Sequence, residues 1–445
     1  MASGLTREIA EFGYRLRYEE LPHEVVDKVK VCTLHGICVG LASVEMKTAQ
    51  QALRFVKRVF TQGETGTRLL MNGIRAPIVG ATFANSVLFH SRIQEDDFHE
   101  GLIHLGVIVL PAALAVAEQM RRSGKDFITA VALGYEIGAR ISQTYASLSV
   151  KRGIRSTPLY GPLAAGIASA KLLGLTEEQM INTLGWGANN GGGLLECGIA
   201  QTISEMPFQA GFASSAGLMA AFLAQEGVIA APTLLEGERG FLRAFAGSNE
   251  GMEKVTAGLG RDYYMRETFF KLYPVGGILQ APVSAILDLM KKNPIEPLKV
   301  QGVEVRMSPV EALYPGVDSM KPGPMNLRYC LSMAICEGKM TTSAIDGVMN
   351  ECVSNLMSKI KLIPDEGIKP LSCKISVATS DRGSIENQTR FDTMDFNFDE
   401  EVELVRSLIP EMKLPGNQVN KAIEIMRNLE ACKDMTSLIE SLLPS

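Results

Sequence analysis

Apolar and polar residues alternate along most of the chain with the spacing of α-helices. From residue 5 to about residue 260, apolar positions recur every three or four residues, and almost no segment alternates with a period of two. This period is typical of helices with one or more buried faces. The pattern predicts helices within 5–60 and at 76–93, 105–120, 127–145, 162–173, 177–188 and 211–225.

The pattern changes after about residue 260. Residues 300–307 and 372–379 alternate with a period of two and are rich in β-branched residues, which predicts two strands, and a turn sequence follows the second. The last part of the chain is helical again. We therefore expect a mainly α protein in which both chain ends (1–266 and 397–445) form a large all-helical domain and 267–396 form a smaller, inserted α+β lid domain.

Composition and charge narrow the class of protein. Of 445 residues, 46% are hydrophobic and 21% are charged, which is ordinary for a globular protein. The formal net charge of −5 argues against a nucleic-acid partner and against a basic membrane-binding surface. The longest uncharged stretch, 206–225, contains Gln, Ser and Gly, so we interpret it as a buried helix and not as a membrane span.

Two further features predict a cytoplasmic protein. The first residues contain no apolar run of the kind that a secretory signal needs. The eight cysteines form no C-x-x-C pair, and the spacing of Cys32 and Cys38 does not suit a zinc site. We expect all eight to be reduced thiols, most of them in the core.

Polar residues with catalytic potential crowd into one connection between two apolar helices. It contains His90, His99 and His104, with the acidic run Glu-Asp-Asp at 95–97 between them. Loops held by rigid elements often carry function, although a solvated turn is the simpler alternative. The histidine spacing matches no common metal motif, so general acid–base catalysis is favoured over metal binding. A histidine titrates near neutral pH, and a neighbouring carboxylate can orient it.

Two basic residues are further candidates. Lys271 lies in the segment FFKLYPVGG at the predicted domain boundary, as either a placed ammonium or a surface lysine whose stem covers the aromatic residues. Arg155 precedes an apolar helix and either binds a carboxylate in bidentate fashion or is solvated. The chain has no G-x-G-x-x-G after a strand, no Walker loop, no G-x-S-x-G and no H-E-x-x-H, so we expect neither a cofactor nor a metal.

Together these segments resemble the MmgE/PrpD family, whose members include 2-methylcitrate dehydratases, cis-aconitate decarboxylases and iminodisuccinate epimerases. The resemblance covers nearly the whole chain. Its most specific part, 90–118, ends in HLGVIVLPAALAVAE and is similar to the family's H…DD…H-x-G…PAALAxAE pattern. Shorter similar segments follow in the family's order at 134–136, 161–175, 235–237 and 271–274.

The resemblance implies a fold, a chemistry and an assembly. The family's fold is a helical domain from both chain ends with an inserted α+β lid, and the active site lies between the two. Its members are cofactor-free homodimers that rearrange small di- and tricarboxylic acids by proton abstraction, dehydration or decarboxylation. A lyase or isomerase that acts on a small carboxylic acid, without cofactor or metal, is therefore implied.

The resemblance also assigns catalytic residues. His104 matches the family's histidine and would act as the acid or base. Asp96 and Asp97 match its paired aspartates, and one or the other would orient that histidine. Lys271 matches the lysine that opens the lid and, with Arg155, would hold a carboxylate or stabilise an enolate-like charge. Tyr329 matches the lid tyrosine and would donate a proton.

Other positions depart from the family pattern. Phe98 and Met206 replace a threonine and a lysine, and Arg155 replaces a histidine. Fewer cations and more apolar surface favour a substrate that is less charged than citrate, because apolar burial stabilises by about 25 cal/mol per Å². The substrate-binding positions that we expect are Gln94, Phe98, His99, Arg155, Met206, Gln209 and Gln280.

Three functions remain open at this point. The first is a lyase or isomerase that uses His104 for proton transfer. The second is a cyclase or isomerase for a larger, more apolar biosynthetic intermediate, in which the fold serves as a shaped pocket. The third is a non-catalytic binding protein, against which the retained polar cluster at 90–104 and Lys271 argue.

Overall fold

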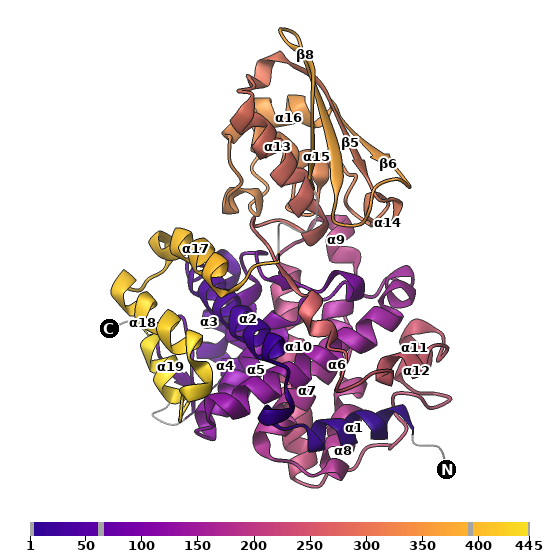
Figure 1. Cartoon of the computed structure of the whole chain (residues 1–445), viewed down its shortest axis with the longest axis vertical. Helices are drawn as coiled ribbons and strands as arrows, with labels where there is room; N and C mark the ends of the chain where they lie inside the picture. The colour runs from indigo at the N-terminus through magenta and orange to yellow at the C-terminus, as the bar shows by residue number, and fades with distance from the viewer. Residues whose placement is uncertain (1–3, 61–65, 390–394, 444–445) are drawn as a thin grey trace.

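The computed structural model describes residues 4–60, 66–389 and 395–443, which form two bodies, one built mainly of helices and one that contains a sheet (Figure 1). This confirms the predicted fold class, mainly α with a smaller α+β part. Residues 1–3, at the start of the first predicted domain, and 390–394, near the predicted end of the lid, lie outside the described residues.

The helical body has one continuous core, to which helices from both ends of the chain contribute. Helices α5, α7 and α10 lie at its centre and are buried over most of their length. Its helices are α1 (Leu5–Arg15), α2 (His23–Leu41), α3 (Lys47–Val59), α4 (Ile78–His90), α5 (Gly106–Gln119), α6 (Gly124–Lys151), α7 (Ser156–Leu173), α8 (Glu177–Asn189), α9 (Glu196–Ala200), α10 (Glu205–Gln225), α11 (Phe241–Ala246), α12 (Met252–Thr256), α17 (Phe398–Leu408), α18 (Gly416–Arg427) and α19 (Thr436–Ser441).

Small residues and capping side chains explain the packing and the limits of these helices. A Cβ atom on Gly217 of α10 would lie 2.6 Å from the carbonyl oxygen of Pro162 in α7, so these two helices pack too closely for a larger side chain. Ser123 caps α6 in a capping box with Asp126. The long predicted helices are present, whereas α9, α11 and α12 are too short to show a period in the sequence. In the described part of the chain, none of the helices combines the length and the apolar character that crossing a membrane requires.

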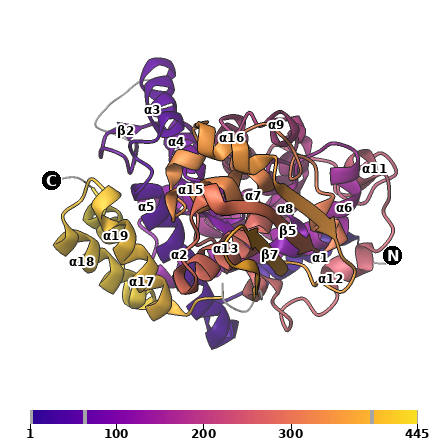
Figure 2. The same cartoon turned by 90° about the horizontal axis from the view of Figure 1, so that it is seen from above.

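The second body is a four-stranded sheet with helices packed on it (Figure 2). The strand order is β6-β5-β7-β8, with β5 parallel to β6 and the other pairs antiparallel. The two predicted strands are confirmed as β5 and β7, and the predicted turn joins β7 to β8. Its elements are α13 (Gln280–Lys292), β5 (Val300–Met307), α14 (Pro309–Ala312), α15 (Leu327–Glu337), α16 (Glu351–Met357), β6 (Ile360–Pro364), β7 (Cys373–Thr379) and β8 (Gly383–Thr389).

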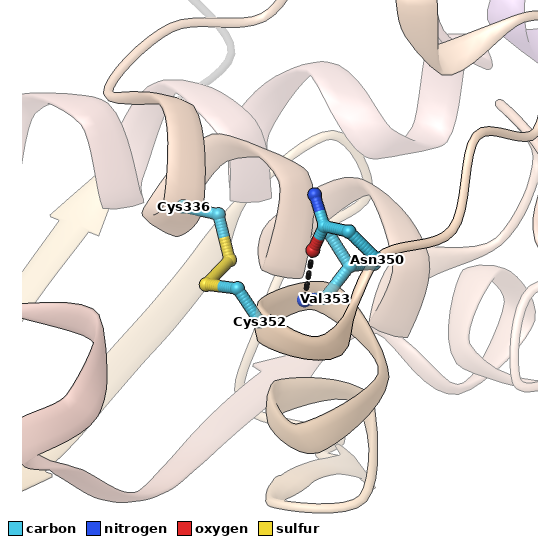
Figure 3. Close-up of a disulfide and its surroundings, with 4 residues drawn as sticks. All are labelled: Cys336, Asn350, Cys352 and Val353. Atoms are coloured by element: carbon cyan, nitrogen blue, oxygen red, sulfur yellow. Dashed lines mark hydrogen bonds between the residues drawn. A yellow bond between two sulfur atoms is a disulfide. The ribbon is translucent and has the colours of Figure 1, made fainter.

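A disulfide joins two helices of this second body (Figure 3). Cys336 near the end of α15 bonds to Cys352 in α16, and their Cα atoms are 6.4 Å apart. The Asn350 side chain accepts a hydrogen bond from the Val353 N–H at 2.9 Å and so starts α16 beside α15. The expectation that all eight cysteines are thiols is therefore wrong for this pair, because only the packing of the two helices brings them together. The other six cysteines are free.

Two further pairs of short strands lie outside the four-stranded sheet. β1 (Thr67–Arg68) pairs with β2 (Arg75–Ala76). β3 (Asp96–Asp97) pairs antiparallel with β4 (Phe269–Phe270), so that the polar connection after α4 lies beside the segment that leads into the second body. Residues that are far apart in the sequence thus meet at the boundary between the two bodies.

Candidate active site

A small, partly enclosed cavity lies at this boundary. Its walls come from the connection between α4 and α5, the start of α7, helices α9 and α10, the segment after β4, and two residues of the second body, Tyr314 and Met325. The polar residues that line it are His90, Glu95, Asp97, His99, His104, Arg155, Lys271 and Tyr314. The structure therefore gathers half of the predicted catalytic and binding residues around one space.

The backbone of the connection between α4 and α5 is strained where it lines the cavity. Ile93 and Leu102 have φ angles of 55° and 49°, a left-handed conformation that few non-glycine residues adopt. Such strain costs about 1–3 kcal/mol per residue and concentrates at functional sites. Both residues line the cavity. The backbone here is thus shaped for the placement of side chains and not for its own stability.

The pairing of β3 with β4 decides which acidic side chains face the cavity. Successive residues of a strand point to opposite sides. Glu95 and Asp97 therefore line the cavity, whereas Asp96 points into the helical core, where it accepts hydrogen bonds from the Tyr135 hydroxyl at 2.6 Å and the Gly106 N–H at 2.9 Å. The structure thus places Asp96 outside the cavity lining.

The same pairing sets Lys271 opposite Glu95. The Lys271 Nζ lies 2.5 Å from the Glu95 Oε1, and both side chains are only 1% exposed. Lys271 is therefore a buried, paired ammonium and not a surface lysine. Burial raises the pKa of Glu95, but His90 and Lys271 outweigh burial and hold that pKa well below its usual range. Glu95 is consequently a carboxylate that lies against the Lys271 Nζ.

Arg155 and His90 form a second buried pair. The Arg155 Nη2 donates a hydrogen bond to the His90 Nε2 at 2.8 Å, so this ring nitrogen carries no proton. The His90 Nδ1 lies 3.0 Å from the Glu95 Oε2. Burial lowers the pKa of His90, and the charges of Arg155 and Lys271 add to that effect although Glu95 opposes it. His90 is therefore a neutral imidazole.

Of the three histidines that line the cavity, His104 has the most exposed side chain. Its side chain is 18% exposed, and its Nδ1 lies 3.7 Å from both the Glu95 Oε1 and the Asp97 Oδ2, too far for a hydrogen bond. This buried nitrogen has no hydrogen-bond partner among the described residues. Burial and the Lys271 ammonium hold the pKa of His104 well below its usual value. A neutral ring with an unbonded nitrogen at a cavity is able to accept a proton.

Asp97 and His99 complete the polar wall. Burial raises the pKa of Asp97 to about 7, against the opposing charge of Lys271. A Cβ atom on Gly277 would lie 2.0 Å from the Asp97 Oδ2, so a larger residue at this position would displace the carboxyl group. Burial lowers the pKa of His99 to about 4, and its Nε2 lies 3.5 Å from the Glu311 Oε1 of the second body.

Of the predicted binding residues, Arg155, His99 and Met206 line the cavity. Gln94 does not, because its side chain joins the two segments behind the cavity: its Nε2 donates to the Leu272 carbonyl oxygen at 2.8 Å. Phe98 packs in the core of the helical body.

Three more predicted residues lie beside the cavity or away from it. The Gln209 Oε1 accepts a hydrogen bond from the Arg155 Nη1 at 3.2 Å and so supports it. The Gln280 Oε1 accepts from the backbone N–H of Leu272 at 2.9 Å and supports the segment after Lys271. The Tyr329 hydroxyl donates to the Val348 carbonyl oxygen at 3.0 Å within the second body and does not line the cavity.

Three polar lining residues, His90, Glu95 and Tyr314, were not assigned a role from the sequence. His90 and Glu95 belong to the polar connection at 90–104, but the sequence pattern there does not indicate which acidic side chain faces the cavity. The period of two in β3 would have separated Glu95 and Asp97 from Asp96, had a strand been expected there. Tyr314 lies in an irregular segment after α14 and carries no signal of this kind.

The described residues contain no group of three or more His, Cys, Asp or Glu side chains arranged to hold a metal ion. The site is instead an arrangement of paired charges and neutral histidines. Such a site can bind an anionic group, move a proton and stabilise developing negative charge.

Comparisons with known proteins place this site in a family. The family model described as the MmgE/PrpD N-terminal domain matches residues 7–253. A cis-aconitate decarboxylase of Aspergillus terreus is 31% identical over 306 residues, which cover 66% of this chain and 61% of that protein. The cis-aconitate decarboxylase-like protein oryM of Aspergillus oryzae is 27% identical over 305 residues, which cover 65% and 62%.

The human cis-aconitate decarboxylase is 23% identical over 464 aligned positions, which cover 98% of this chain and 94% of that protein. The matches to the two Aspergillus relatives span only 61% and 62% of the lengths of those proteins. The family match covers more than half of the chain and includes the connection between α4 and α5 that forms the cavity. This chain belongs to the MmgE/PrpD family.

Proposed function

We propose that this protein is a cofactor-independent lyase or isomerase that acts on a carboxylic acid by proton transfer at His104. The observation that carries the proposal is the neutral, unbonded imidazole of His104 at a cavity that also holds Arg155 and the Lys271–Glu95 pair. The names of the relatives, cis-aconitate decarboxylases, support a reaction of the lyase type. Dehydration, decarboxylation and epimerisation are the reactions that this chemistry serves.

Three lining residues have defined tasks in such a reaction. Arg155 holds a carboxylate of the substrate. His104 takes a proton from carbon, or returns one to it, at the position next to the bond that breaks. Lys271, fixed by Glu95, faces the negative charge that develops there and stabilises it without reorganisation. The proposal includes a homodimer, which the family resemblance supports.

The lining also favours a substrate with fewer charges than citrate-type acids. Ile93, Leu102, Leu195, Met206 and Ile278 contribute apolar surface to the cavity. This surface supports, as a second candidate, a cyclase or isomerase for a larger and more apolar intermediate, in which the shape of the pocket matters more than proton transfer.

Replacement of His104 by Gln separates the two candidates. A panel of carboxylic acids is incubated with the enzyme in D₂O, and NMR follows product formation and deuterium uptake at carbon. We expect His104→Gln to lower turnover by roughly two to four orders of magnitude, as for a general acid–base group. Substitution of the exposed His23 by Gln is the matched control and should leave turnover unchanged.

Unchanged turnover in His104→Gln would remove His104 from the mechanism. If a Met206→Ala variant then lost activity, the shaped-pocket function would replace the proton-transfer function.

A further inference from the structure

Arg155 is a buried cation that forms no ion pair with a carboxylate among the described residues, although the charges of Glu95 and Asp97 act on it from a longer distance. Its side chain is 5% exposed. It donates hydrogen bonds to three neutral acceptors, the Met206 carbonyl oxygen at 3.3 Å, the Gln209 Oε1 at 3.2 Å and the His90 Nε2 at 2.8 Å. Among the described residues, no carboxylate oxygen lies within 4.0 Å of it. A buried charge is normally paired, so the missing partner of Arg155 is an anion from outside the chain.

The other cation of the cavity is already neutralised. Lys271 and Glu95 form a contact of 2.5 Å with both side chains buried, so a carboxylate of the protein already offsets the charge of the lysine. Glu95 also faces His90 and His104. The cavity therefore offers one unpaired positive charge, that of Arg155.

An apolar wall stands next to Arg155. Met206, whose carbonyl oxygen holds Arg155, packs in a small cluster with Ile93, Cys197 and Ile203, and Met325 of the second body packs against them. Ile93, Met206 and Met325 also line the cavity. A group bound to Arg155 thus has apolar side chains on one side of it.

We propose that Arg155 binds the single carboxylate of a monocarboxylic substrate, whose apolar body lies against the Met206 side of the cavity. This inference rests on the proposed function and names the substrate class for the same site. A second or third carboxylate would be buried with no cation to pair with and would remain uncompensated. Charge complementarity therefore selects against the di- and tricarboxylic acids that the family resemblance implies.

Three acids of similar size test the charge argument: pentanoate, pentanedioate and propane-1,2,3-tricarboxylate. Isothermal titration of the full chain at pH 7 measures the Kd of each. We expect pentanoate to bind about tenfold or more tightly than pentanedioate, and the tricarboxylate to bind more weakly still. Tighter binding of pentanedioate or of the tricarboxylate, or binding of none of the three, overturns the proposal.

Two variants and one control sharpen the test. Arg155→Gln should weaken pentanoate binding about tenfold or more, because a charge-assisted pair is lost, while Arg152→Gln, at an exposed neighbouring arginine, should not. Met206→Lys adds a second cation to the cavity and should reverse the order of pentanoate and pentanedioate. Unchanged pentanoate affinity in Arg155→Gln, with its circular dichroism spectrum intact, overturns the proposal, as does an unreversed order in Met206→Lys.

The inference and the proposed function fail in different experiments. If the acids bind in the expected order but His104→Gln keeps full turnover, proton transfer at His104 is wrong and the binding site for one carboxylate stands. If His104→Gln is inactive but the tricarboxylate binds most tightly, only the monocarboxylate inference is wrong.

Discussion

Two buried histidine–glutamate pairs in this protein have similar composition and opposite character. In the first, the His35 Nδ1 lies 2.8 Å from the Glu401 Oε1, and its Nε2 lies 2.7 Å from the Gln94 carbonyl oxygen. Both partners accept hydrogen bonds, so both ring nitrogens of His35 donate and the ring is an imidazolium. Burial lowers the pKa of His35, but the Glu401 carboxylate outweighs burial and raises it above the usual value.

The second pair, His104 and Glu95, lacks these bonds. The His104 Nδ1 stays 3.7 Å from the Glu95 Oε1, which is occupied by Lys271, and the pKa of His104 is well below its usual value. The difference teaches that burial beside a glutamate does not make a histidine functional. A histidine with both nitrogens bonded holds structure together, whereas one with an unbonded nitrogen at a cavity is available for chemistry.

The His35–Glu401 pair helps to position the residues around the His104–Glu95 pair. His35 in α2 and Glu401 in α17 hold the backbone of Gln94. Gln94 in turn binds the Leu272 carbonyl oxygen, one residue after Lys271. The C-terminal helices thus keep the two segments that carry Glu95 and Lys271 at their short distance.

Replacing each glutamate in turn should give the largest difference between the two histidine–glutamate pairs. Glu95→Gln leaves Lys271 buried without a counter-charge, which should cost about 3–5 kcal/mol of unfolding free energy and lower turnover. Glu401→Gln weakens a hydrogen bond to a charged ring and should cost about 1.5–3 kcal/mol, with turnover per folded molecule close to that of the parent. Urea unfolding and turnover measure both effects. Equal loss of turnover in the two variants would contradict the division into a chemical and a structural pair.

The pH dependence of stability should also differ in sign between the two histidines. His35 has a folded-state pKa above its unfolded value, so its stabilisation is complete below pH about 6.5 and is lost as the pH rises through the folded pKa. His104 has a folded-state pKa below its unfolded value, so its stabilisation is present above pH about 6.5 and is lost as the pH falls.

Unfolding free energies at pH 5.5 and pH 8.0 measure this difference. Relative to the parent, His35→Leu should lose more stability when the pH falls from 8.0 to 5.5. The reason is that the protonated His35 ring stabilises the parent at low pH, and the variant lacks this ring. His104→Gln should lose less, because its buried neutral ring no longer has to be protonated. The same acid dependence in both variants would mean that the two rings have the same charge state.

The parts of the fold and site that were predictable depend on local spacing. The long helices and the strands at 300–307 and 372–379 show their period in the sequence, and the connection at 90–104 is conspicuous because it is polar between apolar helices. The choice among Glu95, Asp96 and Asp97 depends on a pairing with Phe269–Phe270, which no local pattern records. The disulfide likewise depends on the packing of α15 and α16 and could not be predicted from cysteine spacing.

The smallest expected effect is on kcat/KM, and it distinguishes two tyrosines. Tyr329 was assigned from the family resemblance, whereas Tyr314 lines the cavity. Burial raises the pKa of Tyr314 to about 12, so its hydroxyl stays protonated and can donate one hydrogen bond to a ligand in the cavity it lines. Tyr314→Phe should therefore lower kcat/KM by roughly fivefold, the equivalent of about 1 kcal/mol, and leave stability nearly unchanged. Tyr329→Phe removes the bond to Val348 and should cost about 1 kcal/mol of unfolding free energy without a change in kcat/KM. The opposite result, with kcat/KM lowered only in Tyr329→Phe, would show that Tyr329 reaches the substrate through a movement of the second body, because in the present arrangement its hydroxyl is bonded within that body.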